Sequence, residues 1–242
     1  MNLRTCLLLP AFTCLFFAQS QTNGLTADEI LNRSIAYHDP DSMWGKLQGE
    51  IRIRVTYADG PDRFSRIRMD QPASAFHIRV QRGGPQKEYV LKGSECQLYY
   101  DGSASFTPEI AEKEDLNCER ARFWRDYYGY LLGMPMKLRD PGTRIAPVVS
   151  RKTFKGKEYW VLKATYDPDK GKDTWYFYFD PESYALKAYQ FYHDEAANDG
   201  EYILLEGEKR LGSLRLPASM AWYRNEADAF LGKDIIEGTG PL

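Results

Sequence analysis

The sequence predicts an α+β fold that is mostly antiparallel β-sheet, with one helix near the N-terminus and a second helix inserted between strands. Short stretches of alternating apolar and polar residues follow one another at even spacing, separated by turn residues, which is typical of an antiparallel meander. The period changes to that of a helix between Thr26 and Asp39, and again from about Asn117 to Leu132. An aromatic content of 14%, dominated by 17 tyrosines, also favours strands.

Residues 1–20 have the pattern of an export signal. Arg4 supplies the positive charge, Leu7–Phe17 the apolar run, and Ala18 and Ser20 the small residues that precede cleavage before Gln21. The apolar run is too short to cross a bilayer, which takes roughly 20 residues. We therefore expect a signal peptide and a mature chain that is not transmembrane.

Cys14 leaves a lipoprotein open as an alternative. Phe12 and Thr13 precede this cysteine, however, where a lipid-attachment motif has small residues. We expect an exported protein, periplasmic or associated with the envelope, that is not lipid-anchored through Cys14.

The mature chain, residues 21–242, is expected to form a single domain, since β-rich domains of roughly 200–250 residues are common. A net charge of −2 and a pI near 6.0 give no case for binding nucleic acid.

Removal of the signal leaves two cysteines, Cys96 and Cys118. In an oxidising compartment they can form one disulfide, which would stabilise the fold by about 3 kcal/mol. The alternative is two unpaired thiols. Neither cysteine has a nearby histidine, so the sequence predicts no zinc site.

The first helix has clear signals at both ends. Thr26 and Glu29 form a capping box. Asp39-Pro40 ends the helix, because proline disfavours helical geometry in the residue before it. An apolar stripe between these ends predicts that the helix packs on the sheet.

Strands are predicted on both sides of the second helix. Before it they are Ile51–Tyr57, Arg66–Asp70, Phe76–Gln81, Tyr89–Leu91 and Cys96–Tyr100. After it they are Ile145–Phe154, Tyr159–Tyr166, the two arms of a hairpin from Thr174 to His193, Tyr202–Leu211, Leu216–Tyr223 and Phe230–Ile236, the last of which we expect to close the sheet.

The second helix and the hairpin are both apolar on more than one side. The helix runs from about Asn117 to Leu132, with Gly133 as its C-terminal cap, and the hairpin turns at Asp180-Pro181-Glu182-Ser183. Such elements either lie wholly in the core or leave an apolar cavity between them for a ligand. The candidate ligand-binding residues are Phe123, Trp124, Tyr127, Tyr128, Leu131, Met134, Met136, Trp175, Phe177 and Phe179.

Five arginines occupy the polar positions of three consecutive strands: Arg52, Arg54, Arg66, Arg68 and Arg79. On neighbouring antiparallel strands their guanidinium groups share one face. That face could bind anionic headgroups or the carboxylates of a partner protein. The alternative is a solvated outer face on which Glu50, Asp62 and Asp70 supply the counter-charges.

Histidine chemistry offers a third possibility. His38 and His193 both stand beside carboxylates, as in acid–base pairs or metal half-sites. Adjacent strand residues point to opposite faces, so His193 and Asp194 would not converge on one ion. The chain also lacks the nucleophile-elbow, zinc-protease, phosphate-loop and dinucleotide motifs. We predict no enzyme, no metal and no cofactor.

Several motifs, in their order along the chain, resemble those of the LolA/LolB/RseB-type lipoprotein carriers. They are the helix with Ile30, Leu31, Ala36 and Tyr37, the strand Gly49–Tyr57, the Lys92-Gly93 turn before Gln97–Asp101, the Asp180–Lys187 turn, and Leu216-Pro217 before Met220–Tyr223. The resemblance implies a curved, open half-barrel whose helices lie in its concave side. In the carriers that concavity holds acyl chains. No functional residue of the carriers maps onto this sequence.

The sequence thus favours a non-enzymatic envelope protein that binds a hydrophobic or amphipathic ligand, a lipid or a lipoprotein acyl chain. The alternative is an interaction or sensor module of the same fold, with a filled core and another envelope protein as its partner.

Overall fold

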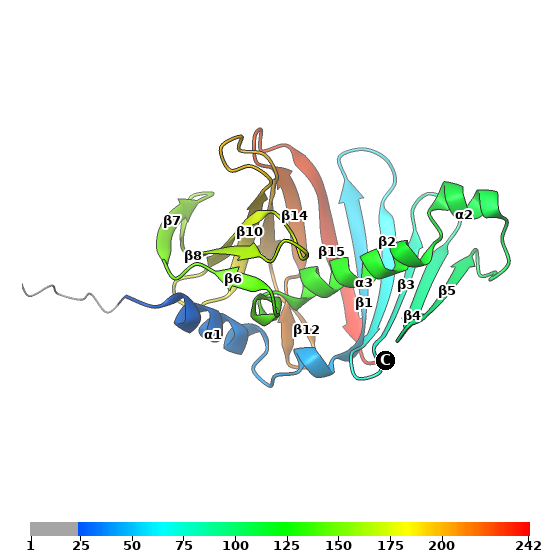
Figure 1. Ribbon diagram of the computed structural model, residues 1–242, viewed down its shortest axis with the longest axis horizontal. Coiled ribbons are helices and arrows are strands. Elements are labelled where there is room, and N and C mark those ends of the chain that lie inside the picture. The colour runs from blue at the N-terminus through cyan, green and yellow to red at the C-terminus, as the bar shows by residue number, and fades with distance from the viewer. Residues whose placement is uncertain (1–23) are drawn as a thin grey trace, which may run out of the picture.

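The computed structural model describes residues 24–242, and one antiparallel sheet of thirteen strands dominates it. The sheet curves into an open trough and does not close (Figure 1). Strands follow the order β5-β4-β3-β2-β1-β15-β14-β11-β10-β9-β8-β6, and β7 also pairs with β8. The predicted signal peptide lies outside the described residues.

The first half of the sheet consists of β1 (Gln48–Tyr57), β2 (Arg63–Asp70), β3 (Ala75–Gln81), β4 (Lys87–Lys92) and β5 (Glu95–Tyr100). The second half consists of β6 (Thr143–Ile145), β7 (Ser150–Phe154), β8 (Lys157–Tyr166), β9 (Thr174–Phe179), β10 (Leu186–Tyr192), β11 (Glu201–Glu206), β14 (Ser219–Arg224) and β15 (Phe230–Gly240). A separate two-stranded ribbon is formed by β12 (Lys209–Leu211) and β13 (Leu214–Leu216).

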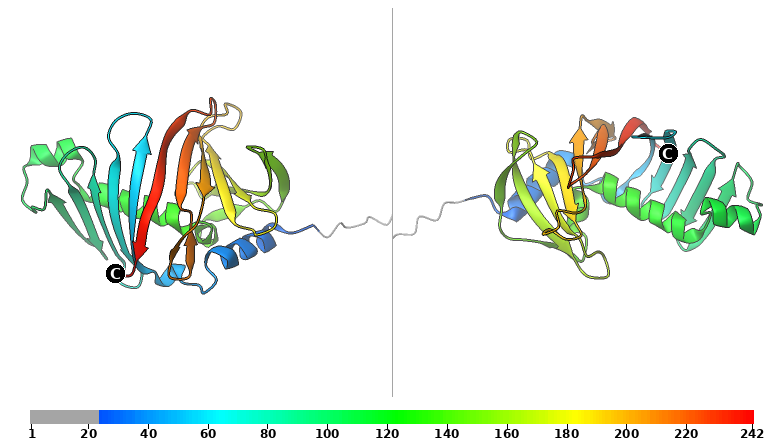
Figure 2. Two further views of the ribbon diagram at one scale, coloured as in Figure 1. Left: turned by 180° about the vertical axis from the view of Figure 1, so that it is seen from behind. Right: turned by 90° about the horizontal axis from the view of Figure 1, so that it is seen from above.

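The helices are α1 (Ala27–His38), α2 (Pro108–Glu114) and α3 (Cys118–Gly133), with 3-10 turns η1 (Trp44–Lys46) and η2 (Met136–Arg139). The inserted helix α3 lies along the concave side of the sheet and crosses the strands of its first half (Figure 2). The predicted fold class is therefore confirmed: a mostly antiparallel, open sheet with one N-terminal helix and one inserted helix. The predicted capping box at Thr26 and Glu29 is also present.

The structure corrects five details of the predicted elements. The stretch Ile145–Phe154 is two strands, β6 and β7, with Pro147 between them, and both pair with β8. Pro217 and Gly207, the latter at φ +66°, break two further predicted strands. Helix α2 was not predicted, because seven residues are too few to show a helical period. The last strand, β15, pairs with β1 and β14, so it joins the two halves of an open sheet.

The two apolar faces of the hairpin are covered by the chain itself. On the inner face, Phe177 and Phe179 are wholly buried in the main core. On the outer face, β7 curls back so that the Phe154 ring stacks on Tyr178, with 4.6 Å between centroids. A small second cluster, centred on Val161, Tyr178 and Ala188, fills the space beneath. This cover explains why the hairpin sequence lacks a polar side.

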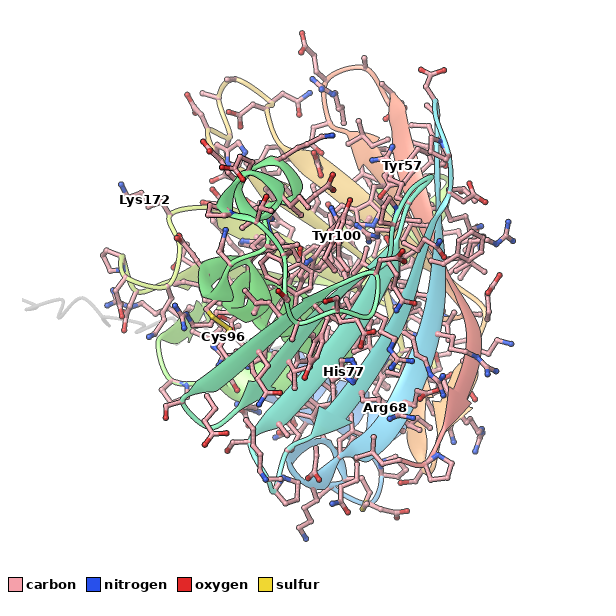
Figure 3. The ribbon with its side chains drawn as sticks, turned by 90° about the vertical axis from the view of Figure 1, so that its right-hand side faces the viewer. Tyr57, Arg68, His77, Cys96, Tyr100 and Lys172 are labelled. Atoms are coloured by element: carbon pink, nitrogen blue, oxygen red, sulfur yellow. A yellow bond between two sulfur atoms is a disulfide. The ribbon has the colours of Figure 1, made fainter. Side chains whose placement is uncertain are left out.

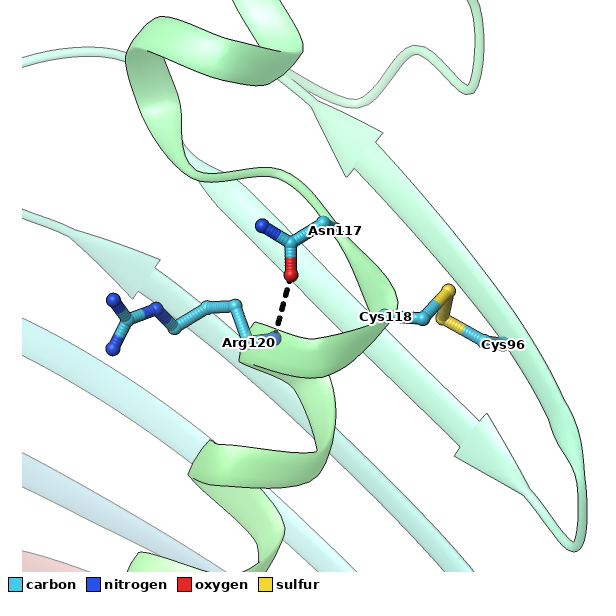
Figure 4. Close-up of a disulfide and its surroundings, with 4 residues drawn as sticks. All are labelled: Cys96, Asn117, Cys118 and Arg120. Carbon is cyan, nitrogen blue, oxygen red and sulfur yellow. Dashed lines mark hydrogen bonds between the residues drawn. A yellow bond between two sulfur atoms is a disulfide. The ribbon is translucent and has the colours of Figure 1, made fainter.

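One disulfide ties the inserted helix to the edge of the sheet. Cys96 on β5 is bonded to Cys118, the first residue of α3 (Figure 4). Beside it, the Asn117 side chain caps the helix by accepting a hydrogen bond from the Arg120 backbone N–H at 2.7 Å. The N-terminal end of α3 is thereby fixed over β4 and β5.

Candidate functional site

A cleft opens where the ends of β1 to β4 face the N-terminal half of α3. Its volume is about 420 Å³, within the range of roughly 300–1,000 Å³ that is usual for ligand sites. The sheet, the β3–β4 turn, the end of α2 and α3 all contribute residues to it. The lining residues are Tyr57, Arg63, Val80, Arg82, Gly84, Pro85, Lys87, Tyr89, Glu114, Asp115, Arg120 and Trp124.

Four of these residues are cationic and two are acidic, and the acidic ones are already paired. The Lys87 ammonium lies 3.2 Å from the Glu114 carboxylate, and Arg120 binds Asp115. These two ion pairs join β4 to α2 and the start of α3. They leave Arg63 and Arg82 as the cleft's remaining cations.

Aromatic rings form much of the rest of the wall. The Arg82 guanidinium lies 3.9 Å from the centroid of Tyr57, and the Arg63 guanidinium 4.9 Å from that of Trp124. Trp124 in turn stacks on Tyr128, at 5.7 Å between centroids. The cleft therefore offers flat apolar surfaces beside positive charge, an arrangement that suits an amphipathic ligand.

Arg63 continues from the cleft into a buried polar cluster beneath α3. Its terminal nitrogen donates to the Tyr128 hydroxyl at 2.8 Å and lies 3.8 Å from Oδ1 of Asp234. Asp234 is 2% exposed and accepts a hydrogen bond from Nε1 of Trp222 at 2.9 Å. Burial raises the pKa of Asp234 to about 6, although Arg63 opposes this.

Several buried atoms of this cluster have no hydrogen-bond partner among the described residues. They are Nε of Arg63, Oγ of Ser65, Oδ1 of Asp234 and the hydroxyl of Tyr189. Unpaired polar atoms are costly in the interior of a protein. Polar atoms under α3 are therefore less completely hydrogen-bonded than is usual in a protein interior.

Most of the predicted ligand-binding residues lie away from this cleft. Only Trp124 of that set lines it. Helix and hairpin are in direct contact, with 5.4 Å between the ring centroids of Tyr130 and Trp175. Phe123 is 47% exposed on the outer side of α3. The remaining members pack in or against the main core: Tyr127, Tyr128, Leu131, Met134, Met136, Trp175, Phe177 and Phe179.

The five arginines do share the outer face of the sheet, and carboxylates neutralise most of them. Arg52, Arg66 and Arg79 stand opposite one another on β1, β2 and β3. Oε2 of Glu50 accepts from both Arg66 at 2.7 Å and Arg68 at 2.8 Å. Hydrogen bonding to these arginines lowers the pKa of Glu50.

The remaining outer-face arginines differ in their partners. Nε of Arg79 lies 2.8 Å from Oε2 of Glu88, which also bonds His77, the neighbour of Arg68 across the strands (Figure 3). Arg54 pairs with Glu237 and Asp62. Arg52 has no carboxylate within 4.0 Å among residues 24–242. The predicted counter-charge Asp70 is not used in this way, since it accepts from Gln48 and from the backbone of Ala73.

The histidines are held in structural contacts. His38 is 6% exposed, its Nδ1 lies 2.8 Å from the Arg215 carbonyl, and its Nε2 accepts from the Leu186 backbone N–H at 3.0 Å. A neutral ring that donates through Nδ1 satisfies both bonds, and burial lowers the pKa of His38. His193 bonds Asp173 at 2.8 Å on the surface. Within residues 24–242, no group of three or more metal-ligating side chains is found.

Sequence reasoning missed Arg63, Arg82 and Asp234. For two of them, the alternation of inward- and outward-facing residues along a strand gives a signal in the sequence. Arg63 lies at even spacing from Ser65 and Ile67, and Asp234 precedes the buried Ile236 by two residues, so both belong to inward-facing rows. Arg82 lies in a turn, where no periodicity applies.

Solved structures that resemble this one were found at low identity. The LolA superfamily protein NE2245 from Nitrosomonas europaea has 12% identity and a TM-score of 0.48, with 89% of this chain and 93% of that chain covered. A putative outer membrane lipoprotein-sorting protein domain from Vibrio parahaemolyticus has 10% identity and a TM-score of 0.42, covering 86% and 90%. A DUF1329 family protein from Desulfovibrio piger has 6% identity and a TM-score of 0.49, covering 88% and 92%.

The names of the first two of these structures agree with the resemblance predicted from the sequence. Among residues 24–242, no helix has the length and apolar character needed to cross a membrane. No curated protein matches the chain. A family model does match, over residues 7–237. Because that match spans most of the sequence, the protein belongs to the family of unknown function DUF6503.

Proposed function

We propose that this chain is a non-enzymatic, exported envelope protein that binds a hydrophobic or amphipathic ligand, a lipid or a lipoprotein acyl chain, on the concave side of its sheet. The observation that carries the proposal is the cleft of about 420 Å³ between α3 and the ends of β1 to β4. Its aromatic walls suit an apolar chain, and its position at the end of α3 gives access from solvent.

The incomplete hydrogen bonding under α3 also supports this site. Asp234, which faces the cleft residue Arg63, is buried with one unpaired oxygen atom. Interiors evolved only for stability rarely keep such groups. A helix that covers unpaired polar atoms can be displaced at lower cost than one that covers only apolar core, because displacement lets water bind those atoms.

Native mass spectrometry of the protein purified from the envelope of its own source tests the proposal. We expect a co-purifying amphiphile that is lost when Trp124 is replaced by alanine. The matched control is Trp160→Ala, because Trp160 also stacks with an arginine but lies on β8, away from the cleft. A protein free of lipid that also fails to bind a fluorescent fatty acid would contradict the proposal. The same material tests export, since we expect its first residue to be Gln21.

A second candidate function, an interaction module with a filled core, is favoured by one observation. Helix α3 and the hairpin are in direct ring contact through Tyr130 and Trp175. For such a module, Arg52 is the outer-face arginine best able to bind a partner's carboxylate, because it has no partner of its own within 4.0 Å among residues 24–242. Loss of a co-purifying envelope protein in Arg52→Glu, but not in Arg144→Glu on β6, would support this function.

A further inference from the structure

We propose that the cleft selects ligands with an anionic head, a carboxylate or a phosphate, and that Arg82 at its mouth and Arg63 at its base bind that head. This inference rests on the proposed function, since it names the class of ligand for the same cleft.

Charge pairing within the cleft is the first argument. Lys87 and Arg120 are bound to Glu114 and Asp115, which are the two acidic residues of the lining. Of the two arginines left after this pairing, Arg63 faces the buried Asp234 at 3.8 Å, whereas Arg82 has no carboxylate within 4.0 Å among residues 24–242. The uncompensated positive charge is therefore centred on Arg82. Excess positive charge in a partly enclosed cleft attracts anions and repels cations.

Arg82 is free to bind and is already oriented. Its Nε donates to the Pro61 carbonyl at 3.2 Å, and its guanidinium carbon lies over the Tyr57 ring, 3.9 Å from the centroid. Among residues 24–242 it has no carboxylate within 4.0 Å and no acceptor for its two terminal nitrogens. A guanidinium held by Nε and stacked on a ring presents its remaining donors to a carboxylate or a phosphate with little further loss of freedom.

Arg63 extends the positive surface inwards. Its nearest carboxylate oxygen, Oδ1 of Asp234, is 3.8 Å away, beyond hydrogen-bonding distance, and its Nε has no acceptor within the described chain. The Arg63 guanidinium also lies over Trp124, so positive charge and an apolar wall meet at the base of the cleft. An anionic head between the two arginines would leave its apolar chain beside Tyr57 and Trp124.

The test is isothermal titration calorimetry, which measures the affinity of the purified protein for three ten-carbon ligands: decanoate, decyl phosphate and neutral decan-1-ol. Inorganic phosphate and acetate test the head without a chain. The variant is Arg82→Gln, and Arg82→Lys keeps the charge. The matched control is Arg151→Gln, because Arg151 also stacks on an aromatic ring, 4.4 Å from the centroid of Trp160, but lies on β7.

We expect at least one of the two anions to bind about tenfold or more tightly than decan-1-ol, as a charge-assisted hydrogen bond predicts. Arg82→Gln should weaken binding of the anionic ligand about tenfold and leave decan-1-ol binding unchanged. Arg82→Lys should restore part of the lost affinity, and Arg151→Gln should have no effect. Whether decanoate or decyl phosphate binds more tightly distinguishes the two head groups.

Equal affinity for all three ligands, or equal effects of the Arg82 and Arg151 substitutions, would overturn this inference and leave the proposed function standing. Failure of every ten-carbon ligand to bind would overturn both. A further outcome is that inorganic phosphate binds as tightly as decyl phosphate, with both affinities depending on Arg82. That result would support the anion site but overturn the proposed amphipathic ligand.

Discussion

The terminal nitrogen of Arg63 on β2 donates to the hydroxyl of Tyr128 on α3, at 2.8 Å. This bond joins the sheet to the helix that crosses it, next to the cleft. Tyr128 is wholly buried, and the burial raises the pKa of its hydroxyl to about 12, so the group stays a neutral acceptor at ordinary pH. The same arginine faces the cleft and the buried Asp234, so the two regions share one side chain.

Replacing Tyr128 by phenylalanine should lower the free energy of unfolding by about 1–3 kcal/mol, because a buried guanidinium loses its acceptor. Urea unfolding measures this change. Tyr99→Phe is the control, since its hydroxyl bonds Gln97 on the exposed face of β5 and its loss should cost little. Equal stabilities of the two variants would show that the Arg63–Tyr128 bond does not hold α3 to the sheet.

Removing the disulfide should destabilise the fold. Replacing both Cys96 and Cys118 by alanine opens a loop with a sequence separation of 22 residues. Loop-closure entropy predicts a loss of about 3 kcal/mol in the free energy of unfolding. The measurement is chemical denaturation with and without a reducing agent. Reduction should weaken only the parent protein, and a double variant as stable as the oxidised parent would refute this account of the cross-link.

The buried Asp234 should make stability fall as pH rises. Its pKa is raised to about 6 in the folded protein, above the ordinary value of 3.8, so the folded state binds the proton more tightly than the unfolded state. The contribution is complete below pH 4 and is lost as pH rises through 6, amounting to up to about 3 kcal/mol. In Asp234→Asn, the free energy of unfolding should fall less steeply between pH 4 and pH 7. An unchanged slope would mean that Asp234 does not titrate in this range.

Opposite to the effect of Asp234, the buried His38 should make stability rise with pH. Burial lowers its pKa in the folded protein, so protonation favours the unfolded state. Its contribution to stability is present above the unfolded pKa, about 6.5, and is lost as pH falls below that value. His38→Gln should weaken the fold at pH 8 and remove this part of the pH dependence. His193→Gln, at an exposed site, is the control, and matching behaviour of the two variants would count against the buried role.

The parts of the fold that follow local chemistry could be predicted from the sequence. The capping box of α1 and the one-sided alternation of β1 to β3 each depend on neighbouring residues, and both are found. The hairpin could not be interpreted in this way. Its outer face is covered by Phe154, whose place depends on how β7 curls back over β8 and β9, and no local pattern encodes that contact.

The candidate site was harder to predict for a similar reason. Aromatic side chains on α3 indicated apolar contacts, but the sequence did not show that the C-terminal half of the helix fills its space against Trp175 while the N-terminal half leaves a cleft. The difference depends on the distance between the helix and the ends of four strands. The disulfide and the Lys87–Glu114 ion pair hold this end of α3 and α2 against the sheet, and both are tertiary contacts.

The most direct test of the ligand site is a pair of NMR titrations, one with decanoate and one with decyl phosphate, observed at the assigned indole N–H signals of Trp124 and Trp175. We take the ligand that binds more tightly as the one that reports on the site. Trp124 lines the cleft, and Trp175 packs against α3 at the other end of the helix. We predict that the Trp124 signal moves in a saturable manner while the Trp175 signal stays in place. A saturable shift of Trp175 with Trp124 unmoved, or no shift of either signal with both ligands, would contradict a ligand site at the cleft.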